Sequence, residues 1–220
     1  MKNKLGIFCM ILGTALLLGA LSLFLRNQHE AADAANSAEA LLPQIIEMIK
    51  ENQSAAQCEP LPPPATEGAS DESTAPTLPT IGDIYNPEMT VAEINGYGYV
   101  GYLSIPSLGL ELPIMSKWDY ARLKIAPCRY TGSTKTDDLV LSAHNYSRHF
   151  GAIAQLKIGA TVIFTDMDGV VSTYEAKEIT VLPPTAVEEM TAGIYDLTMF
   201  TCTYGGKNRV TVRCDRVINE

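Results

Sequence analysis

The stretch LTMFTCTYGGKNRVTVRCDR, residues 197–216, decides the fold of this chain. It contains two runs of β-branched and apolar residues, separated by residues 204–208, which include two adjacent glycines. Strand-like runs on either side of a short glycine-containing segment are typical of a β-hairpin. The stretch therefore predicts two antiparallel strands, with Cys202 at the end of the first and Arg209 at the start of the second.

Similar strand-like runs occur upstream, from about residue 81. They lie at residues 97–105, 110–115, 138–143, 161–165 and 170–181. The last two are joined by a segment that ends in Asp168-Gly169, a strong hairpin signal. Helices are expected only near residues 116–123, 149–156 and 185–190. Roughly seven or eight short strands with few helices predict a mainly β domain over residues 81–220, either a closed barrel or a sandwich.

The N-terminal segment has the length and composition of a membrane span. Residues 5–25 carry no charge and are bracketed by Lys2 and Lys4 before them and by Arg26 after them. At ~1.5 Å per residue they would form a helix about 32 Å long, and a hydrocarbon core is ~30 Å thick. A cleaved signal peptide would have a shorter apolar region, of ~7–15 residues, and a cleavage site after it. We therefore expect residues 1–26 to be an uncleaved single-pass anchor in the cell membrane, with the rest of the chain facing outward.

Residues 27–80 connect this anchor to the β domain. Apolar residues recur in the first part at helical spacing: Leu41, Ile45, Ile46 and Ile49. This spacing predicts a juxtamembrane helix that is interrupted at Pro43. Residues 54–80 are rich in proline, serine and acidic residues, a composition that cannot bury a core and favours an extended stalk. The stalk is expected to hold the β domain away from the membrane.

The negative charge of the chain is concentrated around this connection. No lysine or arginine occurs between Lys50 and Lys117, and the nine acidic residues of that stretch account for the whole net charge of −9. A chain of this composition is a poor candidate for binding the phosphate backbone of a nucleic acid.

The five cysteines are distributed over all parts of the chain. Cys9 lies in the apolar segment and Cys58 in the stalk. No Cys-x-x-Cys pair occurs and the three histidines lack metal-ligand spacing with the cysteines, so no structural zinc site is expected. A disulfide between Cys128 and Cys214 is possible outside the cell if their geometry allows it. Cys214 shares a strand face with two valines, and we interpret it as a small core residue.

Cys202 differs from the other cysteines because it stands at a strand end beside a loop, where a nucleophilic thiol is accessible. The predicted hairpin brings Arg209 back beside it, and a fixed cation favours a thiolate and can stabilise an oxyanion. His144, at the end of an apolar run, is the candidate proton carrier. Arg213 and Arg216 are rival arginines, interpreted as charge on the surface or the rim of the domain.

Residues 198–202 read TMFTC and are followed by Arg209, and residues 141–145 read LSAHN. The first of these segments resembles the TLxTC…R signature of the sortase family of cysteine transpeptidases. The second is similar to the histidine segment of the same family. The order of histidine, cysteine and arginine matches, as do the anchor and the stalk, and the resemblance extends over residues 97–217.

Some features of the sequence depart from the usual sortase pattern, and others indicate which sortase class the chain resembles. Ala143 stands where sortases usually have glycine. The short connection between the cysteine and the arginine resembles class C and class D members, and residues 182–196 are too few for the helical insertion of class B. Four acidic residues could form a calcium site like that of class A members, although a solvated acidic rim is the preferred interpretation: Asp137, Asp138, Glu188 and Glu189.

The resemblance implies an eight-stranded sortase β-barrel and an enzyme on the surface of a Gram-positive bacterium. It implies that the Cys202 thiolate attacks an LPxTG-like C-terminal sorting signal, that His144 protonates the leaving amine, and that Arg209 holds the substrate and its oxyanion. The resulting thioester would pass to an amine of a cell-wall precursor or of a pilin lysine. The partners implied are proteins with a sorting signal and an amine acceptor, and no cofactor or metal is implied.

Two other functions stay open from the residues alone. A non-catalytic, membrane-anchored β domain for adhesion or assembly would have no need of His144, Cys202 and Arg209 together. A thiol hydrolase would use the same three groups, and the presence of an amine acceptor in the products would separate it from a transpeptidase.

Overall fold

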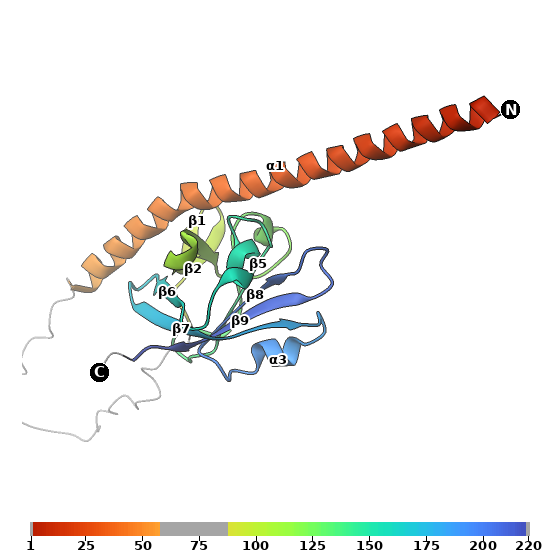
Figure 1. Ribbon diagram of the computed structural model, residues 1–220. Helices are drawn as coiled ribbons and strands as arrows, with labels where there is room; N and C mark the ends of the chain where they lie inside the picture. Colours follow the sequence, from red (N-terminus) through yellow and green to blue (C-terminus); the bar gives the residue numbers. More distant parts are fainter. Residues whose placement is uncertain (1, 58–87, 219–220) are drawn as a thin grey trace, which may run out of the picture.

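The computed structural model of the chain describes residues 2–57 and 88–218, and Figure 1 shows a long helix lying along one side of a β domain. With η marking 3-10 helices, the elements in chain order are α1 (Lys2–Gln57), β1 (Ala92–Ile94), β2 (Tyr97–Ile105), η1 (Pro106–Leu108), β3 (Leu110–Met115), η2 (Arg122–Lys124), β4 (Cys128–Thr131), β5 (Leu139–Ala143), η3 (Phe150–Gln155), β6 (Thr161–Asp166), β7 (Val171–Leu182), α3 (Val187–Thr191), β8 (Leu197–Cys202) and β9 (Arg209–Arg216). The strands predicted from the sequence are all present. The short strands β1 and β4 were not predicted, because three or four residues are too few to show alternation.

Eight of the strands close into a barrel. Their order is β2-β3-β4-β5-β8-β9-β7-β6, and β6 pairs back with β2, while β1 adds to the end of β2. Neighbouring strands are antiparallel except for β3 with β4 and β5 with β8, which are parallel. Closure pairs the edges that an open sheet would leave exposed. The prediction of a mainly β, eight-stranded barrel is confirmed.

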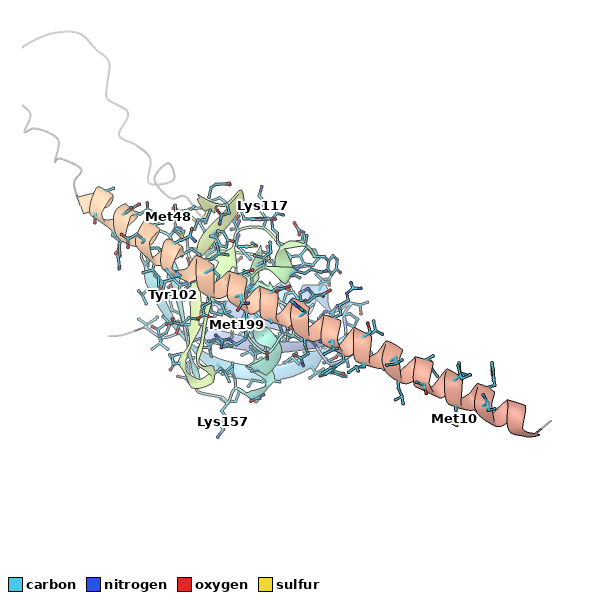
Figure 2. The ribbon with its side chains drawn as sticks, turned by 90° about the horizontal axis from the view of Figure 1, so that it is seen from above. Met10, Met48, Tyr102, Lys117, Lys157 and Met199 are labelled. Atoms are coloured by element: carbon cyan, nitrogen blue, oxygen red, sulfur yellow. The ribbon has the colours of Figure 1, made fainter. Side chains whose placement is uncertain are left out.

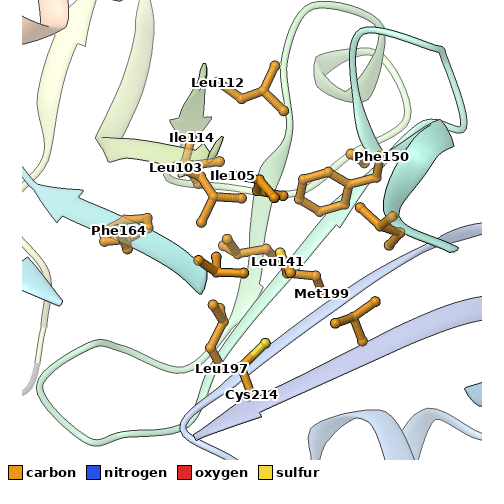
Figure 3. Packing of buried hydrophobic residues seen from close by; sticks show 14 of the residues in the cluster. Leu103, Ile105, Leu112, Ile114, Leu141, Phe150, Phe164, Leu197, Met199 and Cys214 are labelled. Atoms are coloured by element: carbon orange, nitrogen blue, oxygen red, sulfur yellow. The ribbon is translucent and has the colours of Figure 1, made fainter. Parts of the chain in front are cut away.

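The barrel interior is filled by apolar side chains from alternate strand positions. Leu103, Leu141 and Met199 are fully buried there and point toward one another in Figure 3. Cys214 lies in the same cluster, which confirms its interpretation as a core residue. Cys128 is equally buried but belongs to a second cluster, between the barrel and α1, and both thiols are free. The disulfide considered for this pair is therefore not formed.

The helix α1 continues through Pro43, so the expected interruption at this residue is wrong. Leu41, Ile45 and Ile49, on both sides of the proline, are buried in the second cluster against the barrel. Proline removes one backbone hydrogen bond from a helix interior. A helix bends at a proline and does not end there when the segments before and after it are both held by tertiary contacts. Packing against the barrel supplies those contacts here. Figure 2 shows the helix crossing over the whole domain, with Met48 above the barrel and Met10 beyond it.

The N-terminal half of α1 meets the requirements for a membrane span. Its most apolar stretch has a mean hydropathy of 2.4, and none of that stretch is buried against the rest of the chain. The C-terminal half of α1 is docked on the barrel, so the predicted juxtamembrane helix joins the domain directly. Residues 58–80, where the extended stalk was expected, lie outside the described residues.

We expect the replacement of Ile45 by alanine to destabilise the docked helix. The side chain is fully buried between α1 and the barrel, so the change removes packed apolar volume and leaves a cavity. The free energy of unfolding should fall by about 2–4 kcal/mol, measured by urea unfolding of the full chain in detergent. Glu47→Ala alters an exposed residue of the same helix and should stay within about 0.5 kcal/mol of the parent. An equally small loss for Ile45→Ala would contradict the docking.

Candidate active site

The parallel pairing of β5 with β8 places His144 and Cys202 at the same end of neighbouring strands. The register aligns Ala143 with Thr201, so the two candidate residues are the next position on each strand. Adjacent strands lie ~4.8 Å apart. Ala143 belongs to the barrel core, so the alternation of strand side chains directs His144 to the outside of the barrel.

A side-chain hydrogen bond holds these two strand ends in register. The hydroxyl of Thr201 donates to the carbonyl oxygen of Ala143 at 2.8 Å, and both residues are buried. The bond lies one residue before His144 on one strand and one residue before Cys202 on the other. It therefore restricts sliding of the two strands at the position where the candidate groups emerge.

His144 and Cys202 line one cleft of about 750 Å³. The side of this cleft opposite the strand ends is formed by α1, whose residues Ala20, Leu23, Phe24, Asn27, Gln28 and Ala31 take part in the lining. The β8–β9 turn, from Thr203 to Gly206, forms a further side. The sequence indicated that α1 has an apolar face but not what it packs against, so this wall of the cleft was missed.

Arg209 is the direct cross-strand partner of Cys202 in the β8–β9 ladder. Residues paired in this way have Cβ atoms about 4.5–5.5 Å apart on the same face. The guanidinium folds over the turn, where Nη1 donates to the carbonyl oxygens of Gly206 and Asn208 at 3.1 Å each. Arg209 thus lies beside Cys202 along the backbone but is not among the residues that line the cleft of His144 and Cys202.

The two rival arginines are held by partners elsewhere on the barrel. Arg213 forms an ion pair with Glu178 at 2.9 Å and lies 5.5 Å from the ring centre of Tyr195. Arg216 donates from Nε to Asp137 at 2.8 Å, at the opposite end of β9 from Cys202. Both contacts agree with the interpretation of these arginines as structural charges on the barrel surface. They also place Asp137 in an ion pair.

The surroundings of the histidine in the cleft favour its neutral form. The His144 ring is half-buried and lies 4.8 Å from the ring of Tyr146, and its Nε2 has no hydrogen-bond partner among the described residues. Burial lowers its pKa, the charge of Lys124 lowers the pKa further, and the carboxylate of Glu30 in α1 opposes the shift. The lowered pKa favours the neutral ring, and a neutral imidazole has one nitrogen that can accept a proton.

A second histidine lies behind the first. His149 is fully buried, its ring is 5.6 Å from that of Tyr146, and neither of its nitrogens has a hydrogen-bond partner among the described residues. Burial lowers the pKa of His149 to about 4, His144 adds to the shift, and the carbonyl of Ala34 in α1 lies close enough to oppose it. The residue was not singled out in the sequence, because a buried histidine leaves no spacing signal.

The other cysteines of the domain do not share the properties of Cys202. Burial is the main cause that raises the pKa of Cys128 and of Cys214 to about 12 each, so both stay protonated thiols inside the protein. Cys202 is only partly buried and opens into the cleft. Within the described part of the chain, no group of three or more histidine, cysteine or acidic residues could hold a metal ion.

Comparisons with known proteins bear on the family and the fold of the chain. The family model described as Sortase domain matches residues 103–217. The structure of sortase C1 from Streptococcus agalactiae is similar with 27% identity and a TM-score of 0.50, over 58% of this chain and 72% of that one. Sortase C from Clostridium perfringens has the same fold at 19% identity and a TM-score of 0.50, over 90% of this chain and 99% of that one. No curated protein matches the chain.

We expect acid to destabilise the protein through His149. In the unfolded chain the pKa of His149 is about 6.5, whereas in the folded protein it is about 4. Between these pH values the unfolded state binds more protons, so lowering the pH favours unfolding. The loss should reach about 3 kcal/mol near pH 4, since each pKa unit corresponds to ~1.4 kcal/mol. Unfolding free energies of the parent and of His149→Phe, measured from pH 7 to pH 4, isolate this contribution. An identical pH dependence in the two proteins would contradict it.

Proposed function

The chain belongs to the sortase family of cysteine transpeptidases, and on this premise we propose that it cleaves an LPxTG-like C-terminal sorting signal and transfers the cleaved protein to an amine of a cell-wall precursor or of a pilin. The observation that carries the proposal is the emergence of His144 and Cys202 side by side into one cleft. The proposed enzyme is anchored by residues 1–26 and faces outward, with residues 81–220 as its catalytic domain.

The chemistry begins with transfer of the Cys202 proton to His144. The thiolate attacks the carbonyl carbon between threonine and glycine of the sorting signal, and a carbon–sulfur bond forms as the oxygen takes the negative charge. The carbon–nitrogen bond then breaks, and the proton on His144 goes to the leaving amine. A thioester remains on Cys202. The acceptor amine attacks its carbonyl carbon and gives a proton to His144, and the carbon–sulfur bond breaks to release the thiolate.

Forming the thiolate and imidazolium pair is unfavourable before any substrate binds. Ordinary pKa values of ~8.5 for cysteine and ~6.5 for histidine differ by about 2 units, or roughly 3 kcal/mol. Burial and Lys124 lower the pKa of His144 and so increase this cost, whereas Glu30 decreases it. A cation beside the sulfur favours the thiolate, and Arg209 occupies the paired position on the ladder.

Arg209 is proposed to bind the oxyanion. Its two hydrogen bonds to the turn both come from Nη1, so the N–H groups on Nε and Nη2 are oriented by the turn and can serve a substrate oxygen. A guanidinium held in this way needs little rearrangement when the charge develops.

The alternatives of a scaffold and of a hydrolase are separated by one measurement. The full chain is incubated with a sorting-signal peptide, with and without an amine, and the mass of the protein and of the products is determined. A transpeptidase gives a Cys202 thioester and a peptide–amine product, whereas a hydrolase gives only the free acid in the presence of the amine. A scaffold gives neither, and its unchanged mass would overturn the proposal.

Removal of Arg209 should lower the rate of thioester formation far more than the affinity for the peptide. Loss of one oxyanion donor typically costs ~2.7–4 kcal/mol, or about 10²–10³ in rate. Arg209→Lys should also be poor, because lysine keeps the charge but not the planar fork. Arg213→Ala is the matched control, and it should be much milder once its folding is verified. Equal rates for the parent and Arg209→Ala would exclude this role.

Only one thiol of the domain is expected to be reactive. Iodoacetamide should label Cys202 in the folded protein and leave Cys128 and Cys214 unlabelled, because both are buried and protonated. Serine at Cys128 and Cys214 together should change peptide cleavage by no more than a few-fold in molecules that fold. Loss of all cleavage in a folded double variant would mean that the nucleophile is another cysteine.

A further inference from the structure

The helix α1 contacts the β domain from one end to the other. Residues 20–31 face the active-site cleft. At the opposite end, Asn52 donates to the carbonyl oxygen of Met167 at 2.9 Å, and Gln53 donates to that of Gly169 at 3.2 Å. The two ends are about 50 Å apart along the helix, at ~1.5 Å per residue. The helix therefore fixes which end of the domain lies nearer to its apolar N-terminal half.

The catalytic end of the domain is level with the end of the apolar segment. Leu23 and Phe24 belong to the charge-free segment that ends before Arg26, and they line the cleft together with Tyr204. Their exposed fractions are 68% and 57%, so the domain covers only part of their surface. From Leu23 to the end of the segment the helix advances only about 3 Å. If the segment spans a bilayer, the β8–β9 turn lies at the bilayer surface.

The chemistry of this turn suits the boundary between lipid and water. Gly205 and Gly206 adopt left-handed φ values of +82° and +74°, which let the chain reverse tightly and project its side chains. Tyr204 is completely exposed, at 101%, and Lys207 is exposed as well. Tyrosine is enriched at membrane interfaces, where its ring contacts acyl chains and its hydroxyl contacts headgroups. Lysine near a membrane surface is attracted to lipid phosphates.

We propose that the β8–β9 turn, residues 203–208, docks on the lipid surface, with Tyr204 at the boundary between headgroups and acyl chains. The cleft of His144 and Cys202 then opens at the membrane surface, and the β6–β7 turn near Gly169 points away from it. The inference rests on the membrane anchor of the proposed function. It follows that a substrate held at the same membrane surface meets the cleft without the enzyme leaving the bilayer.

Tryptophan fluorescence in vesicles tests the depth of the turn. The chain has a single tryptophan, so Trp118→Phe removes the native signal. Into this background a tryptophan is placed at Tyr204, at Val170 or at Leu17, all of which are exposed positions. Each full-length variant is reconstituted in phosphatidylcholine vesicles, with or without bromine on the acyl chains, placed both near the glycerol end and near the bilayer centre, since bromine quenches tryptophan on contact.

The expected result is quenching at two of the three positions. Tyr204→Trp and Leu17→Trp should each lose about half of their emission or more in brominated vesicles, as interfacial and buried positions do. Val170→Trp, beside the far end of α1, should keep its emission. If Leu17→Trp is quenched and Tyr204→Trp is not, the anchor holds and the docking of the turn is refuted. If Leu17→Trp is not quenched either, residues 1–26 do not anchor the protein in the bilayer. Equal quenching of Val170→Trp would contradict the proposed orientation, in which the β6–β7 turn points away from the membrane.

Discussion

The pairing of β5 with β8 is the interaction on which the candidate active site depends. The two strands are parallel, so their C-terminal ends lie together, and the residues that follow Ala143 and Thr201 leave the barrel at the same place. The Thr201 hydroxyl fixes the register with one hydrogen bond at that point. Barrel closure holds both strands between other neighbours, so the positions of His144 and Cys202 are determined by the whole ring of strands.

The helix α1 connects an apolar N-terminal segment, long enough to span a membrane, to the barrel without a spacer between them. Its buried residues lie on both sides of Pro43, and their packing against the barrel keeps the helix continuous there. The same helix carries Asn27 and Gln28 to the active-site cleft. An element that appeared from its sequence to be an anchor and a linker is therefore also a wall of the cleft that His144 and Cys202 line.

Two opposing electrostatic effects act in this cleft. Burial beside α1 and the charge of Lys124 lower the pKa of His144, which leaves the histidine ready to accept a proton but makes its cationic form costly. Glu30 on α1 acts in the other direction by favouring the imidazolium. Arg209 on β9, paired with Cys202 in the ladder, is proposed to favour the thiolate. In the proposed mechanism, the charged pair that makes the nucleophilic attack thus depends on residues from three separate elements.

The sequence by itself determined the features that depend on neighbours along the chain. Alternation and turn residues predicted the β8–β9 hairpin, which places Arg209 opposite Cys202, and an uncharged segment predicted a helix long and apolar enough to span a membrane. The sequence motifs also indicated the sortase family and its barrel. Only the tertiary structure decided that His144 and Cys202, 58 residues apart, share a cleft, that α1 passes through Pro43 unbroken, and that it closes one side of that cleft. These features depend on packing between distant segments, and the free energy of such packing has no periodic signal in the sequence.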